Sequence, residues 1–146
     1  MRRAAGPASD DAAVLAYRGD LHMVRAFVTE HASCAGADRR RAGDLVIAVS
    51  ELAANTYRHT SAGGMVSLWA TADELICQVE DSGHISDPLA GRRHPDPDGG
   101  GQGMWIVHQL CDLVEIRTGP AGTQIRVHMQ LRSAAAESGV RRCAHA

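Results

Sequence analysis

Hydrophobic and polar positions along the first half of the chain predict one strand followed by two helices. Residues 12–18 have the composition of a short edge strand, and residues 20–33 carry apolar side chains at helical spacing after Asp20, a residue type that caps helices. A second helix is predicted over residues 38–60, and the small residues of segment 61–64 end it. The candidate chemistry begins inside this second helix.

The second half of the chain predicts two hairpins, separated by an irregular segment and a third helix. Residues 65–81 alternate apolar and polar positions on either side of a polar turn, as a hairpin does. Residues 84–100 are rich in Pro, Gly, Asp and Arg, and so long an irregular segment is either disordered or a functional lid. Helical spacing returns over residues 101–114, and a closing hairpin is predicted around the turn at 119–122.

The length and hydropathy of the chain predict one soluble domain. A chain of 146 residues is long enough for a single domain with a proper core and too short for two. We expect the domain to span residues 12–132, with disordered ends at residues 1–11 and 133–146. No apolar run reaches the length of a membrane span, and no apolar segment follows the N-terminal arginines as in a secretory signal. We therefore expect a cytoplasmic protein that does not enter the membrane.

The charged and aromatic residues exclude several classes of protein. All fifteen basic residues are arginine, so the chain lacks the lysine of a P-loop, of a Schiff-base enzyme and of an ordinary protein kinase. The net charge of −2 and the 3% of aromatic residues provide neither the basic surface nor the stacking platforms of a nucleic-acid-binding protein. We therefore expect no nucleic-acid partner.

The cysteines give no sign of a metal site. Cys34, Cys77, Cys111 and Cys143 are far apart in the sequence, and none has a metal-ligand spacing to another cysteine or to a histidine. We expect all four to be reduced and structural.

A polar stripe interrupts the second predicted helix. At 100° per residue, Glu51 and Asn55 lie about 40° apart, Arg58 about 20° beyond Glu51, and His59 about 80° away. The stripe is either the solvated face of an amphipathic helix with a fortuitous Glu/Arg pair, or a set of groups that face a pocket. Asn is a poor helix former, whereas its side-chain carbonyl is a good hard-oxygen ligand for Mg²⁺.

Two downstream features indicate anion and base recognition. Asp81 ends a predicted strand and is followed by Gly83, and a strand-end carboxylate can accept a hydrogen bond from the exocyclic amine of adenine. The glycine run 99–103 opens a helix, where backbone N–H groups and the helix dipole favour phosphate. Taken alone, this run equally fits a lid hinge or a plain helix start. It does not match the dinucleotide-binding fingerprint, because Ile106 stands where the last glycine is needed.

The order of these motifs resembles the GHKL (histidine-kinase-like, Bergerat-fold) ATPases over residues 12–132. The resemblance rests on "ELAAN" at 51–55, "DSG" at 81–83, the long lid, "GGGQGMWIV" at 99–107 and "GT" at 122–123. Within that superfamily the chain is most similar to bacterial anti-sigma regulatory factors of the serine-protein-kinase type. The resemblance implies an α+β two-layer sandwich, in which about three helices cover one face of a mixed, mostly antiparallel sheet beside an ATP lid.

The resemblance also implies a set of ATP and Mg²⁺ contacts. Asn55 would coordinate Mg²⁺, and Asp81 would bind the adenine amino group with the support of Gly83 and of a water held near Thr123. Glu51 would be the general base. The phosphates would be lined by Gly99, Gly101, Gly103 and Met104.

Three further positions are compared with the superfamily pattern. Arg58 lies where the superfamily often has a basic residue near the phosphates. His59 matches the anti-sigma pattern, and a packing or capping residue at a helix end is an equally good interpretation. Ile85 replaces a second glycine that usually follows the "DSG" motif, so the turn beneath the nucleotide is expected to be stiffer or differently shaped.

The implied activity is that of an ATP-binding anti-sigma factor. Such a protein would sequester a sigma factor and phosphorylate an anti-anti-sigma antagonist on serine, with a homodimer also implied. Two alternatives stay open: a protein-binding module that is gated by nucleotide or independent of it and lacks kinase activity, and a free-standing ATPase. Phosphoryl transfer needs no covalent enzyme intermediate, which suits a chain without lysine.

Overall fold

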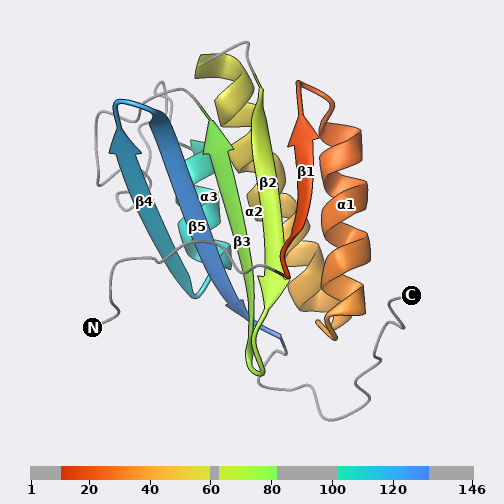
Figure 1. The fold of residues 1–146 in the computed structure, drawn as a ribbon. Helices are drawn as coiled ribbons and strands as arrows, with labels where there is room; N and C mark the ends of the chain where they lie inside the picture. Colours follow the sequence, from red (N-terminus) through yellow and green to blue (C-terminus); the bar gives the residue numbers. More distant parts are fainter. Residues whose placement is uncertain (1–10, 60–62, 82–101, 132–146) are drawn as a thin grey trace.

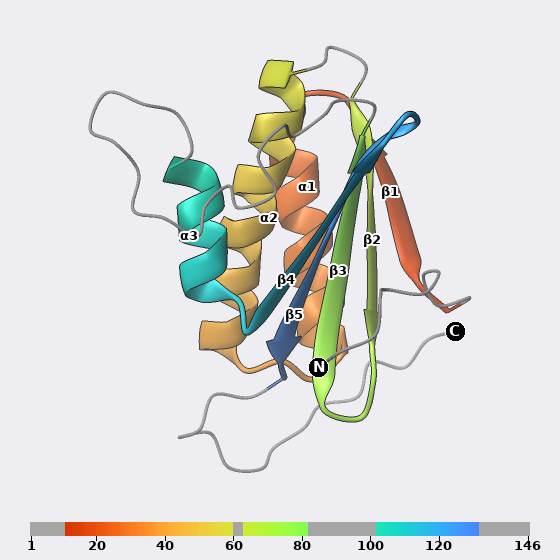
Figure 2. The ribbon, with the colours of Figure 1, turned by 90° about the vertical axis from the view of Figure 1, so that its left-hand side faces the viewer.

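A five-stranded sheet and three helices form two layers in the computed structural model, which describes residues 11–59, 63–81 and 102–131 (Figure 1). The three helices lie side by side on one face of the sheet (Figure 2). In chain order the elements are β1 (Ala13–Tyr17), α1 (Leu21–Cys34), α2 (Arg39–His59), β2 (Gly64–Ala70), β3 (Glu74–Asp81), α3 (Gln102–Leu110), β4 (Leu113–Gly119) and β5 (Gly122–Gln130).

The sheet has the strand order β1-β2-β3-β5-β4, and each of these neighbours pairs antiparallel. The expectation of a mixed sheet is therefore wrong in one detail. The chain runs along β3, returns along α3 and runs along β4, so β4 is parallel to β3 (Figure 1). Because β5 lies between these two strands, no parallel pair forms in the described sheet.

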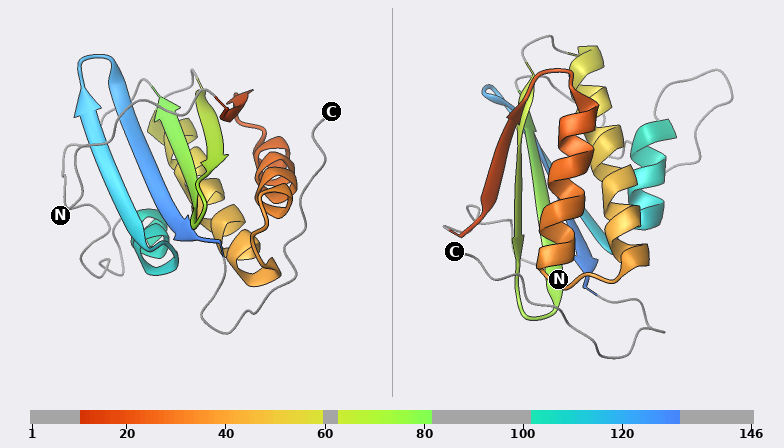
Figure 3. Two further views of the ribbon diagram at one scale, coloured as in Figure 1. Left: turned by 60° about the horizontal axis from the view of Figure 1, so that its bottom comes forward. Right: turned by 90° about the vertical axis from the view of Figure 1, so that its right-hand side faces the viewer.

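The core fills the space between the sheet and the helices. Alternate residues of the central strands point toward the helices, as the period of two requires: Leu75, Cys77 and Val79 of β3 are at most 2% exposed. The apolar faces of the helices pack against these residues. All three helices lie on the same side of the sheet (Figure 3). The fully buried helical residues include Val24, Val28, Leu45, Val49 and Val107.

Aspartates cap the first two helices. The Asp20 carboxylate accepts a hydrogen bond from the Met23 amide at 3.2 Å, and the Asp38 carboxylate accepts one from the Arg41 amide at 2.8 Å. Each cap satisfies an N–H group that has no partner within its own helix. The capping role predicted for Asp20 is confirmed.

The predicted elements are all present, and the expected two-layer fold is confirmed. The largest difference in bounds concerns the third helix, which was expected over residues 101–114 and ends at Leu110. Cys111 and Asp112 connect the helix to β4, which begins at Leu113. The Asp112 amide already pairs with the sheet, since it donates to the His128 carbonyl of β5 at 2.9 Å. None of the helices among the described residues is long and apolar enough to cross a membrane.

One end of the sandwich is closed by hydrogen bonds between elements, and we call this end the base: Asp38, Arg41, Asp73, Asp112, Gln130 and Leu131. The Arg41 guanidinium donates to the Asp112 carboxylate at 2.5 Å and to the Gln130 carbonyl at 3.2 Å. The same carboxylate accepts from the Gln130 amide at 2.7 Å. The base therefore joins the start of α2, the α3–β4 connection and the end of β5.

The face of the sheet turned away from the helices carries buried polar side chains that bind one another. Arg126 is 6% exposed, donates to the Gln78 side-chain oxygen at 2.6 and 3.0 Å, and lies over the Trp69 ring at 5.0 Å. His128 contacts the Glu115 carboxylate at 2.5 Å. Because each group depends on a partner from a neighbouring strand, these contacts favour a single strand register.

The cysteines differ from the expectation at one position. Cys77 and Cys111 are free and buried, whereas Cys34 is disulfide-bonded. The prediction that all four are reduced is therefore wrong for Cys34, which lies half-buried in the last turn of α1. Burial raises the pKa of Cys77, and burial together with the nearby Asp112 raises the pKa of Cys111 to about 12. Both free thiols are therefore protonated and poorly reactive near neutral pH.

Candidate functional site

The end of the sandwich opposite the base gathers most of the residues that the sequence singles out, and we call it the site end. It consists of the C-terminal end of α2, the C-terminal end of β3, the N-terminal end of α3 and the β4–β5 turn (Figures 1 and 2). These four segments are far apart in the sequence. The alternating directions of the helices and strands bring them to one end.

The predicted polar stripe begins on the second half of α2. Glu51 and Asn55 are both half-buried, and they lie one helical turn apart on the same side. Leu52 and Ala53, between them in sequence, are at most 1% exposed and face the core. The stripe is therefore neither core nor fully solvated at these two positions.

The last turn of α2 also contains the two remaining stripe positions. The backbone of Arg58 and His59 is helical, and both residues end the element at the site end. Their side chains lie outside the described part of the structure, so their predicted nucleotide contacts stay predictions.

Asp81 and Thr123 are direct partners across β3 and β5. Asp81 is half-buried at the end of its strand and has the same parity as Cys77 and Val79, so it lies on the helix-facing side of the sheet. Thr123 is 3% exposed, and its hydroxyl lies 3.3 Å from that of Thr118 on β4. The register thus places a carboxylate and a buried hydroxyl side by side, as the predicted adenine site requires.

Gly63 and Gly64 allow close packing beside the end of β3 that carries Asp81. The sequence alone predicted only the end of a helix at these positions. Gly64 is the register partner of Asp81 on β2, and a Cβ there would lie 2.8 Å from the Tyr17 hydroxyl of β1. Gly63 has a φ of +77°, a conformation that glycine tolerates best. Tyr17 is 6% exposed and fills the space left by the glycines. The Gly-Gly pair directly before a strand was the available signal for this close packing.

The segment that is predicted to bind phosphate, residues 99–104, is described only at its C-terminal end. Gly103 lies in the first turn of α3, and Met104 is 4% exposed and belongs to the core. Met104 therefore anchors the first turn of α3 against the rest of the protein, and its predicted contact with the phosphates stays a prediction. Gly83, Gly99 and Gly101 lie outside the described residues, as does Ile85.

The donor set at the site end fits a nucleotide better than a protein-bound metal centre. Asn55 offers a hard carbonyl oxygen, Glu51 a proton acceptor one turn away, and Asp81 an acceptor for an amine. In the described ranges, no group of three or more His, Cys, Asp or Glu side chains is arranged to hold a metal ion. A cation at Asn55 would share its remaining coordination with ligand or solvent oxygens.

Comparison with protein families identifies one match that covers most of the chain. Residues 15–129 match the family described as the histidine kinase-like ATPase domain. No curated protein matches the sequence.

Two solved structures share the architecture at low sequence identity. The RsbU and RsbW domains of Rv1364c from Mycobacterium tuberculosis align with 88% of this chain, with a TM-score of 0.62 and 21% identity. The histidine kinase domain of a blue-light activated histidine kinase from Erythrobacter litoralis EL346 aligns with 76%, with a TM-score of 0.52 and 22% identity. The chain spans 33% of the first structure and 59% of the second, and at these identities the likeness is one of fold.

Proposed function

This chain belongs to the family of histidine kinase-like ATPase domains, and from that membership we propose that it is an ATP-binding anti-sigma regulatory factor. In this role it sequesters a sigma factor and phosphorylates an anti-anti-sigma antagonist on serine. The observation that carries the proposal is the convergence of Glu51 and Asn55 from α2 with Asp81 and Thr123 from the sheet at one end of the fold.

Asp81 selects adenine in this proposal. Its carboxylate accepts a hydrogen bond from the exocyclic amine, a group that guanine does not offer at the same place. The buried Thr123 hydroxyl, the register partner of Asp81, holds a water that reaches the same adenine in this proposal, and the resemblance assigns a supporting role to Gly83. The half-buried position of Asp81 strengthens such a charge-assisted hydrogen bond relative to a fully exposed one.

The catalytic step requires a metal cation and a general base. Helix α2 provides one residue to ligate the cation and another to act as the general base. Asn55 would ligate Mg²⁺, which when bound supplies charge neutralisation at the phosphates. Glu51 accepts the proton of the attacking serine hydroxyl. The resemblance assigns the phosphate contacts to Gly99, Gly101, Gly103 and Met104, with further nucleotide contacts assigned to Arg58 and His59.

The proposed partners rest on two kinds of support. The stretch "ELAANTYRHT" and the sequence of residues 101–129 resemble anti-sigma factors, and the fold is similar to a structure that contains an RsbW domain. A sigma factor and an antagonist protein are therefore the proposed partners, and a homodimer and a cytoplasmic location belong to the same proposal. A nucleotide-gated binding module and a free-standing ATPase are the alternatives that the experiment must separate.

The test is transfer of the labelled γ-phosphate of ATP to a candidate antagonist with a single phosphorylatable serine. We expect label on that serine with the wild type, and a loss of about 10²–10⁴-fold in Glu51→Gln with unchanged ATP binding. Glu30→Gln, the same chemical change at an exposed position of α1, serves as the matched control. ATP binding without transfer to any antagonist would favour the binding module, and phosphate release without an acceptor would favour the ATPase.

A further inference from the structure

One residue from each strand forms a single row across the site end of the sheet. Tyr17 of β1 is the register partner of Gly64 on β2, which is in turn the partner of Asp81 on β3. Asp81 is the partner of Thr123 on β5, and Thr123 is the partner of Thr118 on β4. Directly opposite residues of antiparallel strands point to the same side of a sheet, so the whole row faces the helices. The proposed adenine contacts lie in the middle of this row, and Tyr17 lies at its β1 end.

Gly64 leaves the space into which the Tyr17 side chain extends. A Cβ at Gly64 would lie 2.8 Å from the Tyr17 hydroxyl oxygen and 3.0 Å from Cζ, the ring carbon that carries it. The end of the side chain therefore lies over β2, next to the strand that carries Asp81. The Cβ positions of directly opposite residues are about 4.5–5.5 Å apart, so a single water can link the hydroxyl to the Asp81 carboxylate.

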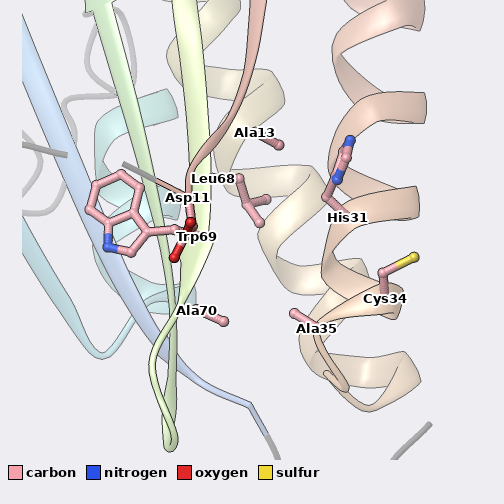
Figure 4. Close-up of a pocket in the computed structure, with 8 residues that line it drawn as sticks. All are labelled: Asp11, Ala13, His31, Cys34, Ala35, Leu68, Trp69 and Ala70. Carbon is pink, nitrogen blue, oxygen red and sulfur yellow. The ribbon is translucent and has the colours of Figure 1, made fainter. Parts of the chain in front are cut away.

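Packing by the Tyr17 ring does not account for its hydroxyl. Ala13 lies at the other end of β1 on the same side, and there a cleft of about 540 Å³ lies open between α1 and the sheet (Figure 4). At the site end the Tyr17 ring fills the space beneath the helices, and the residue is 6% exposed. A phenylalanine would fill this space equally well without the cost of burying a hydroxyl. The hydroxyl oxygen is itself buried, which favours a hydrogen-bonding role for it.

We propose that Tyr17 is a positioning residue of the adenine site, whose hydroxyl donates a hydrogen bond to a bound water that in turn donates to the Asp81 carboxylate. The inference rests on the proposed function, in which Asp81 accepts a hydrogen bond from the exocyclic amine of adenine. A carboxylate offers about four acceptor sites on its two oxygens. The water bridge uses a site on the β2 side and leaves the others to the amine.

The bridge makes adenine affinity depend on a group that does not touch the ligand. Asp81 is half-buried at the end of β3, and without the bridge its carboxylate can rotate away from the orientation that meets the amine. A carboxylate that is already held in that orientation loses less conformational entropy on binding. On the other side of Asp81, the Thr123 hydroxyl lies 3.3 Å from that of Thr118. Asp81 therefore has a hydroxyl-bearing neighbour toward each edge of the sheet.

Titration calorimetry with two nucleotides separates positioning from packing. Tyr17→Phe keeps the ring and removes only the hydroxyl, and it should weaken binding of a non-hydrolysable ATP analogue by about three- to tenfold. The matching triphosphate of purine riboside lacks the exocyclic amine, so Tyr17→Phe and the wild type should bind it equally well. Ser67→Ala removes a hydroxyl that is 5% exposed on the opposite side of β2, and this control should bind both nucleotides as the wild type does.

The two nucleotides also distinguish failure of this inference from failure of the proposed function. An equal loss for both nucleotides in Tyr17→Phe would show that Tyr17 only packs, and an unchanged affinity for the ATP analogue would show that its hydroxyl takes no part. Either result would overturn the positioning role while the wild type still prefers the nucleotide with the amine. A wild type that binds the two nucleotides equally would contradict the contact between Asp81 and adenine, and the role of Tyr17 with it.

Discussion

The base and the site end of the sandwich differ in how their polar groups are used. At the base, Arg41, Asp112 and Gln130 bind one another across three elements. At the site end, Glu51 and Asn55 on the second half of α2 and Asp81 at the end of β3 are half-buried, and these are residues that we propose to bind the nucleotide. We therefore expect the base to contribute to stability and the site end to the proposed chemistry.

Helix α2 connects the two ends, since it begins in the base at Arg39 and carries Glu51 and Asn55 toward the site end. Its first half is fixed by the Asp38 cap and by the Arg41 contacts. A helix held in this way at its first half also has the direction of its second half fixed. Four measurements test this division of roles.

The largest expected effect is on stability at the core of α2. Leu45 is completely buried, and Leu45→Ala should lower the free energy of unfolding by about 2–5 kcal/mol because it removes contacts and leaves a cavity. Denaturant unfolding followed by circular dichroism measures the change. Ile47→Ala, at a position 49% exposed on the same helix, should cost less than about 0.5 kcal/mol. Equal losses would mean that the packing described for α2 is wrong.

The next largest effect is the response to nucleotide. With Mg-ATP at roughly 100 times its dissociation constant, the free energy of unfolding should rise by about 2.7 kcal/mol, because the ligand binds the folded state alone. The same concentration of Mg-GTP should give little change. A thermal melt with each nucleotide measures the difference, and similar shifts with both would contradict adenine selection by Asp81.

Asp81→Asn should weaken ATP binding by about 1–3 kcal/mol, because it removes the charge from the hydrogen bond to the adenine amine. Titration calorimetry with a non-hydrolysable ATP analogue measures the affinity. Asp73→Asn, an exposed aspartate in the turn at the base, provides the matched control and should bind as the wild type does. If Asp81→Asn bound ATP with wild-type affinity, the proposed contact between this carboxylate and adenine would be wrong.

The smallest effect is expected at the base. Arg41→Ala should lower the free energy of unfolding by about 1 kcal/mol, since the Asp112 side chain is 46% exposed and solvent screens the ion pair. Affinity for ATP should not change. Arg40→Ala, at an exposed neighbour, should leave both quantities unchanged. A loss of ATP affinity in Arg41→Ala would show that the two ends are coupled more tightly than the comparison suggests.

The fold was largely predictable because its signals are local. Asp20 stands directly before the first helix, and the hairpins carry period-two patterns with polar turns between them. The strand order was less accessible to sequence reasoning, because β5 pairs with β3 through contacts between residues far apart in the chain. The described sheet has no parallel pair because β5 lies between the parallel strands β3 and β4.

The candidate site was predictable as a set of residue types but not as a geometry. The spacing of Glu51 and Asn55 placed them on one side of a helix, and the structure shows both half-buried. Nothing local indicated that Thr123 would lie opposite Asp81, since this contact depends on strand register. The Gly63–Gly64 pair signalled a close approach, but not that Tyr17 is the residue that makes it. The disulfide at Cys34 was missed for the same reason, because the sequence shows cysteines without showing which of them meet.

The placement of β5 between β3 and β4 also bears on how the chain folds. Glu74 pairs with Gln130 and Ala13 with Leu68, so the sheet is completed only when segments more than forty residues apart find one another. Such non-local pairing predicts folding in milliseconds to seconds rather than microseconds. The free-energy cost of closing such loops, which comes from lost chain entropy, rises slowly, by about 0.6 kcal/mol for each doubling of loop length. A change in the number of residues between two paired strands therefore costs the sheet little.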